Sequence, residues 1–236
     1  MSRWSTWLDG GRAVAHAAAD LAVPLHCGGC SRPGARWCDR CEATLRDDPV
    51  ALTPRVPPPV STWAVGRYVG PCRGAVLALK EHGRGDLVPI LGAAVARDLV
   101  RLAVWSELPH TTGSLILVPA PTRWWAARRR GGDPVTAIAR AAADLLGPRV
   151  AVVGALRTSM WAQDSAGLSA RDRVDNLAHA ISLTARRASL ARLRAPDTAV
   201  VLLDDVLTTG ATATESLRVL AAAGVGVHAV LVIAGA

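Results

Sequence analysis

The segment 200–212 carries the residues best suited to chemistry. Four apolar residues are followed by two adjacent carboxylates, Asp204 and Asp205, and then by a Thr-Thr-Gly-Ala-Thr turn at 208–212. Ligands of open α/β sheets bind at the carboxyl ends of strands, where this pattern would place both carboxylates. The turn leads into a helix, so its backbone N–H groups and hydroxyls can bind an anion. The carboxylates would accept hydrogen bonds from sugar hydroxyls, and the turn would donate hydrogen bonds to a phosphate. Together they indicate a site for a ribose 5-phosphate.

The same segment has a plainer interpretation, namely a strand that ends at an N-capped helix. Each element of the pattern is common when taken alone. A buried strand, paired acids and a glycine-containing anion turn in this order are much rarer, so we favour the ligand site.

Four of the five cysteines form two Cys-x-x-Cys pairs, which predict a metal site. Cys27 pairs with Cys30 and Cys38 with Cys41, and seven residues separate the pairs. Two such turns face to face make a tetrahedral cage of four sulfurs, typical of structural Zn²⁺, with iron as the main alternative. Disulfides and a redox-active pair are disfavoured by the expected cytoplasmic location and by the doubled motif. Cys72 is left over and is expected to be an ordinary, partly buried thiol.

The segment 200–212 resembles the PRPP-binding motif of type I phosphoribosyltransferases. The chain from Leu21 onward resembles the ComF family (ComFC/GntX-like proteins) within that superfamily. Besides the cysteine pairs, the resemblance rests on Tyr68-Val69-Gly70, Leu79-Lys80 with Gly83, Val118-Pro119-Ala120-Pro121, Arg128 with Arg130-Gly131, Leu156-Arg157, Gln163, Gly167-Leu168-Ser169, Arg173 and Asn176. The chain departs from the family at Gly132-Asp133-Pro134, where members commonly have an aromatic residue and Asn. The resemblance implies a type I phosphoribosyltransferase-like fold with a small N-terminal zinc module.

The resemblance also implies a role for each matching residue. Asp204 and Asp205 would be the catalytic acids, bound to the ribose 2′- and 3′-hydroxyls. The other PRPP-binding residues would be Thr208, Thr209, Gly210, Ala211 and Thr212 around the 5′-phosphate, and Lys80, Pro119, Ala120, Arg128 and Arg130 beside the pyrophosphate. Mg²⁺ would arrive with PRPP, held mainly by its oxygens and by water. No residue stands out as a general base, and the polar segment 163–176 is either a lid or a solvated loop.

Two functions follow as hypotheses. The first is Mg²⁺-dependent transfer of phosphoribosyl from PRPP to an unidentified acceptor, a reaction of nucleotide metabolism. The second is a non-catalytic protein that binds PRPP or a ribose-5-phosphate nucleotide and supports DNA uptake (competence) or DNA processing. Single-stranded DNA or a protein of the competence machinery would then be a partner, in keeping with the formal charge of +8 and the zinc module.

The elements that must position these residues divide the chain into three regions. Residues 1–46 hold an Ala-rich amphipathic stretch and the zinc module, 47–61 form a Pro-rich extended linker, and 62–236 form an α/β domain. Apolar runs predict strands at 63–69, 115–118, 150–153, 199–203 and 227–233. Ala- and Leu-rich runs predict helices at 73–81, 88–104, 134–146 and 211–223. Uniformly apolar strands that alternate with helices indicate a mostly parallel sheet flanked by helices.

Composition excludes several other classes of protein. Half of the residues are hydrophobic and 19% are charged, so the chain is neither disordered nor fibrous. Lys80 is the only lysine and Glu81 follows it, so the chain has no P-loop. The uncharged segment 219–236 is interrupted by Gly224 and Gly226, which favours a helix end and a buried strand over a membrane helix. We therefore expect a cytoplasmic protein without membrane insertion.

Overall fold

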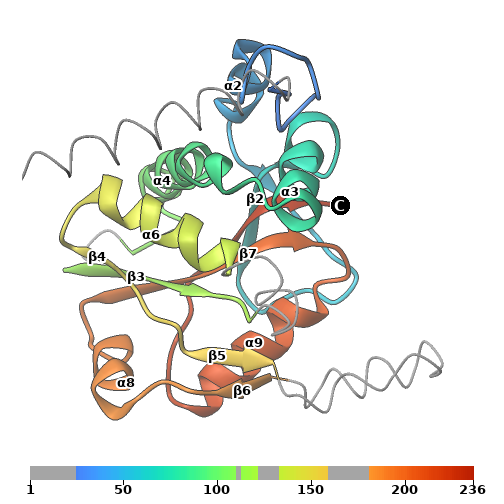
Figure 1. Ribbon diagram of the computed structural model, residues 1–236. Helices are drawn as coiled ribbons and strands as arrows, with labels where there is room; N and C mark the ends of the chain where they lie inside the picture. Colours follow the sequence, from blue (N-terminus) through green and yellow to red (C-terminus); the bar gives the residue numbers. More distant parts are fainter. Residues whose placement is uncertain (1–24, 110–112, 122–132, 159–180) are drawn as a thin grey trace, which may run out of the picture.

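The computed structural model describes residues 25–109, 113–121, 133–158 and 181–236. In these ranges a six-stranded sheet carries helices on both faces (Figure 1). Its strands, in spatial order, are β1 (Val50–Ala51), β2 (Ser61–Arg67), β8 (Ala229–Gly235), β7 (Thr198–Leu207), β3 (Ser114–Pro119) and β4 (Val150–Val152). Only β1 runs antiparallel to its neighbour, so the described sheet is mixed but mostly parallel.

Each face of the sheet is covered by its own helices. The helices on one face are α3 (Gly70–His82), α4 (Val88–Val104) and α6 (Pro134–Leu146), and those on the other are α8 (Arg187–Leu193) and α9 (Ala211–Ala222). Alternate residues of a strand point to opposite faces. In β7, Leu203 therefore packs with α4 and α6, whereas Leu202 packs with α9. Both faces are apolar for this reason, and all seven residues of β8 are buried.

Local sequence explains where the helices begin and end. Asp133 caps α6 by accepting hydrogen bonds from the N–H groups of Val135 and Thr136, and Pro134 suits the first helical position. Gly83 follows α3 in the left-handed conformation, with φ of 60°, which glycine adopts without steric cost. Residues next to the helix ends thus determine where these helices begin and end. The strands and helices expected from residue 62 onward are confirmed in the described ranges.

Several short elements were not expected. They are α2 (Asp39–Leu45), the 3₁₀ helix η1 (Gly85–Leu87), helix α8, and the antiparallel pair β5 (Leu156–Thr158) and β6 (Ile181–Leu183). The expected linker at 47–61 also contains β1, which adds an edge strand to the sheet. Among the described helices, none combines the length and the apolar character that a membrane span requires.

Candidate functional site

The adjacent strands β3 and β7 mark the point at which the order of the sheet reverses. From β3 the chain passes through α6 to β4, away from β7, and from β7 it passes through α9 to β8, away from β3. Helices α6 and α9 lie on opposite faces of the sheet. Open α/β sheets bind ligands in the crevice outside the carboxyl ends of such strands. In this protein Pro119 ends β3, Ala120 follows it directly, and the acid pair lies next to them on the part of β7 that continues beyond β3.

The acid pair lies on the part of β7 that extends beyond β3. The pairing of β3 with β7 ends at Pro119 and Leu203, whereas β7 continues beside β8 as far as Leu207. Strand β7 is longer than the expected 199–203, so Asp204 and Asp205 lie within it. The Nζ atom of Lys80 lies 2.8 Å from Oδ1 of Asp205. The acid pair therefore has a cation from α3 in direct contact.

Asp204 has an unusual protonation equilibrium. Its burial raises its pKa to about 7, and the charge of Asp205 acts in the same direction. The N–H of Asp205 donates a 2.8 Å hydrogen bond to Asp204, and this bond and the Lys80 charge oppose the rise. The carboxylate of Asp133, at the start of α6, adds a smaller repulsion. Near neutral pH, Asp204 is thus divided between its neutral and charged forms.

The threonine turn forms a hollow beside the acid pair. A cavity of about 30 Å³ is lined by Asp204, the end of β7 and residues 208–213. Thr208 and Thr209 are exposed, and α9 begins immediately afterwards at Ala211. The first N–H groups of a helix have no partner within the helix and favour an anion. The hollow therefore offers backbone donors and hydroxyls next to a carboxylate.

The Pro-rich segment 47–61 contacts the threonine turn and the start of α9 through Val56. The N–H of Val56 donates to the carbonyl of Thr209 at 2.9 Å, and the Thr214 hydroxyl donates to the carbonyl of Val56 at 3.3 Å. Gly210 has a φ of +87°, and a Cβ there would lie 2.2 Å from the Val56 carbonyl oxygen. Both its conformation and its surroundings thus require glycine. Contacts made by backbone atoms leave no pattern in the side chains, so these contacts could not be predicted from the sequence.

The four cysteines of the two pairs lie together, as expected. Their sulfur atoms are all within 4.8 Å of one another, with 3.6 Å between Cys27 and Cys41 and 3.7 Å between Cys30 and Cys38. These distances are too long for disulfides. Four sulfurs at about 2.3 Å from a tetrahedral metal would lie about 3.8 Å apart. The cluster can therefore bind a metal such as zinc.

The environment of two sulfurs also fits a metal. Burial alone would raise the pKa of Cys27, but backbone N–H groups from Cys30, Cys38 and Gly29 donate to its sulfur and lower its pKa to about 6. Burial and the neighbouring thiols raise the pKa of Cys41. One thiolate is thus already favoured, and a cation would favour the others. Cys72 is fully buried away from the cluster, and burial raises its pKa to about 11.

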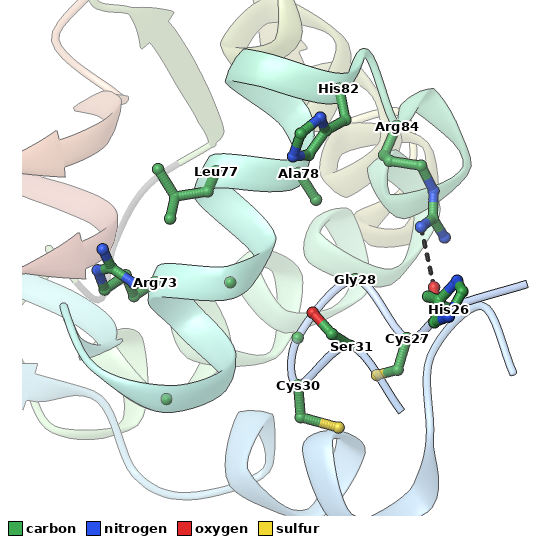
Figure 2. A pocket seen from close by; sticks show the side chains of 13 residues that line it. His26, Cys27, Gly28, Cys30, Ser31, Arg73, Leu77, Ala78, His82 and Arg84 are labelled. Atoms are coloured by element: carbon green, nitrogen blue, oxygen red, sulfur yellow. Dashed lines mark hydrogen bonds between the residues drawn. The ribbon is translucent and has the colours of Figure 1, made fainter. Parts of the chain in front are cut away.

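Helix α3 connects the cysteine cluster with the acid pair. A Cβ on Gly74 would lie 2.0 Å from the carbonyl oxygen of Gly29, so the first cysteine turn rests directly on the helix backbone. Arg84, just beyond α3, donates to the carbonyl of His26 (Figure 2). It also donates to the carbonyl of Arg36 and pairs with Asp86. The same helix carries Lys80 to Asp205. One rigid element therefore contacts both candidate centres.

The structure brings together most of the residues that the sequence singled out. The group at the carboxyl ends of β3 and β7 comprises Lys80, Pro119, Ala120, Asp204, Asp205, Thr208, Thr209, Gly210, Ala211 and Thr212. Arg128, Arg130 and the segment 163–176 lie outside the described residues. Asp133 was noted in the sequence only as a departure from the family. No protein-family model matches the chain, and no curated protein matches it either.

Proposed function

We propose that the chain is a PRPP-binding protein of the ComF family, with a type I phosphoribosyltransferase-like fold, that transfers phosphoribosyl to an acceptor. One observation carries the proposal: paired acids and a threonine turn lie together at the carboxyl end of β7, where the strand order reverses. Sugar-phosphate ligands need both acceptors and donors, and this position supplies them side by side. The resemblance of 200–212 to the PRPP-binding motif supports the same assignment.

In this proposal the turn binds the 5′-phosphate of PRPP and the acids bind the ribose. The N–H groups at the start of α9 and the hydroxyls of Thr208, Thr209 and Thr212 donate to phosphate oxygens. Asp204 and Asp205 accept hydrogen bonds from the 2′- and 3′-hydroxyls. Hydrogen bonds to a charged carboxylate are stronger than those to a neutral acid. We therefore expect PRPP to lower the pKa of Asp204 when it binds.

Lys80 is proposed to exchange partners when PRPP binds. Without ligand its ammonium group is paired with Asp205. In the complex it turns to the pyrophosphate, beside the backbone of Pro119 and Ala120, and releases Asp205 for the ribose. Mg²⁺ would enter with PRPP, held mainly by its oxygens and by water, and would neutralise pyrophosphate charge. The chain's own contribution is to hold the anomeric carbon in place and to stabilise the negative charge of the leaving pyrophosphate.

Calorimetric titration of PRPP with Mg²⁺ tests the assignment. We expect the wild type to bind and the double variant Asp204→Asn/Asp205→Asn to bind at least about tenfold more weakly, or about 1.4 kcal/mol. Asp144→Asn, an exposed acid on α6, is the matched control and should bind like the wild type. A folded, metal-loaded wild type that does not bind PRPP would contradict the proposal.

The second candidate is a protein that binds PRPP or a nucleotide without turnover and assists DNA uptake or processing. The formal charge of +8 favours it, because nucleic-acid affinity depends on such a surplus. Release of pyrophosphate in the presence of a panel of nucleobases and amines would support the enzyme. Binding of PRPP without release, together with salt-dependent binding of single-stranded DNA, would support the accessory protein.

For the cysteine cluster we propose structural Zn²⁺ held by Cys27, Cys30, Cys38 and Cys41. Four thiolates fill a tetrahedral site, so no position is left for a water that could react. The metal would instead fix the fold of the module against α3. Elemental analysis of the purified protein should give one zinc per chain, and loss of zinc from Cys38→Ser would confirm the ligands. Iron in place of zinc would contradict the choice of metal.

A further inference from the structure

A second cavity lies between the first cysteine turn and helix α3, on the side of the helix that faces the module. Its volume is about 600 Å³, within the range of about 300–1,000 Å³ typical of small-molecule sites. Figure 2 shows Arg73 and His82 at opposite ends of the helical wall, with Ser31 and His26 across from it. None of the residues described above for the acid pair and its threonine turn lines this cavity. It is therefore a candidate site distinct from the proposed PRPP site.

The side chains around the cavity define the charge of a suitable ligand. Among the described residues that line it, two are arginines, two are histidines, two are the cluster residues Cys27 and Cys30, and none is an aspartate or glutamate. Arg84 is occupied by Asp86 and by two backbone carbonyls. Arg73 is exposed, and no ion pair is assigned to it within the described ranges. Arg73 thus presents a guanidinium suited to a phosphate group.

Two of the lining residues, Cys27 and Cys30, belong to the cysteine cluster, and Figure 2 shows their sulfurs turned toward one another. A metal cation bound by the cluster would offset part of the charge of its thiolates. Leu77 and Ala78 on the helix give the cavity a partly apolar wall. A flat ring and a phosphate on one ligand would use the apolar wall and the arginine together.

The walls are held in place before any ligand binds. Gly74 has no side chain, which allows the cysteine turn to contact the backbone of α3. Arg84 donates hydrogen bonds to the carbonyls of His26 and Arg36, which lie on the two sides of this turn. A preformed cavity avoids much of the ordering cost of binding. From the volume, the charge and this rigidity, we propose that the cavity binds a small phosphorylated ligand of nucleotide size. The proposal goes beyond phosphoribosyl transfer and does not depend on it.

Amide NMR of the zinc-loaded full chain tests the proposal with AMP as the probe and uncharged adenosine as the control. We expect AMP to shift the amide signals of Gly28, Gly29 and Gly74, and adenosine to bind far more weakly. Arg73→Glu should weaken AMP binding at least about tenfold. Arg192→Glu, the same charge change at an exposed position of α8, should change it less than about twofold. PRPP binding by Arg73→Glu should stay at the wild-type level, which separates this proposal from the previous one.

Three results would overturn the proposal. The first is that AMP moves signals only at 208–213, or none at millimolar concentration. The second is that Arg192→Glu weakens binding as much as Arg73→Glu, which would indicate attraction by total charge alone. The third is that oligo-dT binds at the cavity with an affinity that keeps rising with length, which would make the cavity part of a nucleic-acid track. Arg73→Gln provides a milder variant, and circular dichroism verifies that both variants are folded.

Discussion

Replacement of Asp204 with Asn is expected to stabilise the protein at neutral and alkaline pH. The folded chain disfavours the charged form of Asp204, because the half-buried carboxyl group is desolvated and lies beside Asp205, and its pKa is raised from 3.8 to about 7. Asn keeps an oxygen that can accept the 2.8 Å hydrogen bond from the N–H of Asp205. The substitution therefore removes the charge and leaves the local structure in place.

Proton linkage gives the sign and the size of the effect. Between the two pKa values the folded state binds more protons than the unfolded state, so the free energy of unfolding of the wild type falls as the pH rises from about 4 to about 7. A difference of about three pKa units corresponds to about 4 kcal/mol. Asp204→Asn should therefore be more stable than the wild type by about 4 kcal/mol at pH 8, about 2 kcal/mol at pH 5.5 and about 0.5 kcal/mol at pH 4.

Urea denaturation of the metal-loaded proteins at these three pH values measures the effect. Asp144→Asn is the control, since an exposed acid should give a small difference that does not change with pH. The same variant of Asp204 should lose affinity for PRPP, so stability and binding would change in opposite directions. A stability difference that is equal at pH 4 and pH 8 would refute the reasoning, because the charge of Asp204 would then not be its source.

Three further predictions concern the turn, the lysine and the metal. Gly210→Ala should lower the free energy of unfolding by at least about 1–3 kcal/mol, whereas Gly226→Ala, which has open space around it, should change it by less than about 0.5 kcal/mol in urea denaturation. Lys80→Met should raise the pKa of Asp204 further, because the positive charge of Lys80 lowers it. NMR of the carboxyl groups would follow the titration of Asp204, and an unchanged titration midpoint would contradict an effect of the Lys80 charge on this carboxyl. Removal of the metal by a chelator should lower the unfolding temperature by at least about 5 °C in calorimetry, reversibly on return of Zn²⁺; an unchanged temperature would contradict a structural role.

The sequence predicted the central elements well because their signals are local. Helices α4 and α6 have the expected bounds, 88–104 and 134–146. Pro89 lies in the first turn of α4, and Asp133, Pro134 and Gly147 mark the two ends of α6. The uncharged segment 219–236 forms a helix end and strand β8, as the glycines at 224 and 226 indicated. The cysteine spacing likewise predicted the cluster, because each Cys-x-x-Cys turn brings its own two sulfurs together.

Features that depend on distant partners were not predicted. Strand β7 continues through Asp204 and Asp205 because β8 pairs with it as far as Leu207, which no local pattern reveals. Strands β5 and β6 are three residues long, too short for a recognisable alternation. The ion pair between Lys80 and Asp205 joins residues 125 positions apart. The contact of Val56 with Thr209 involves only backbone atoms.

The position of β8 constrains how the chain can fold during synthesis. This strand follows all the other described strands in the sequence, yet it lies inside the sheet, between β2 and β7. Until the ribosome has released it, the β1–β2 pair and the β7–β3–β4 group have no strand to join them. The apolar faces of both groups would stay exposed, and such intermediates aggregate readily. Productive folding of this sheet is therefore expected to be late, after translation of residues 229–235, and chaperones that shield apolar surface should matter most just before that point.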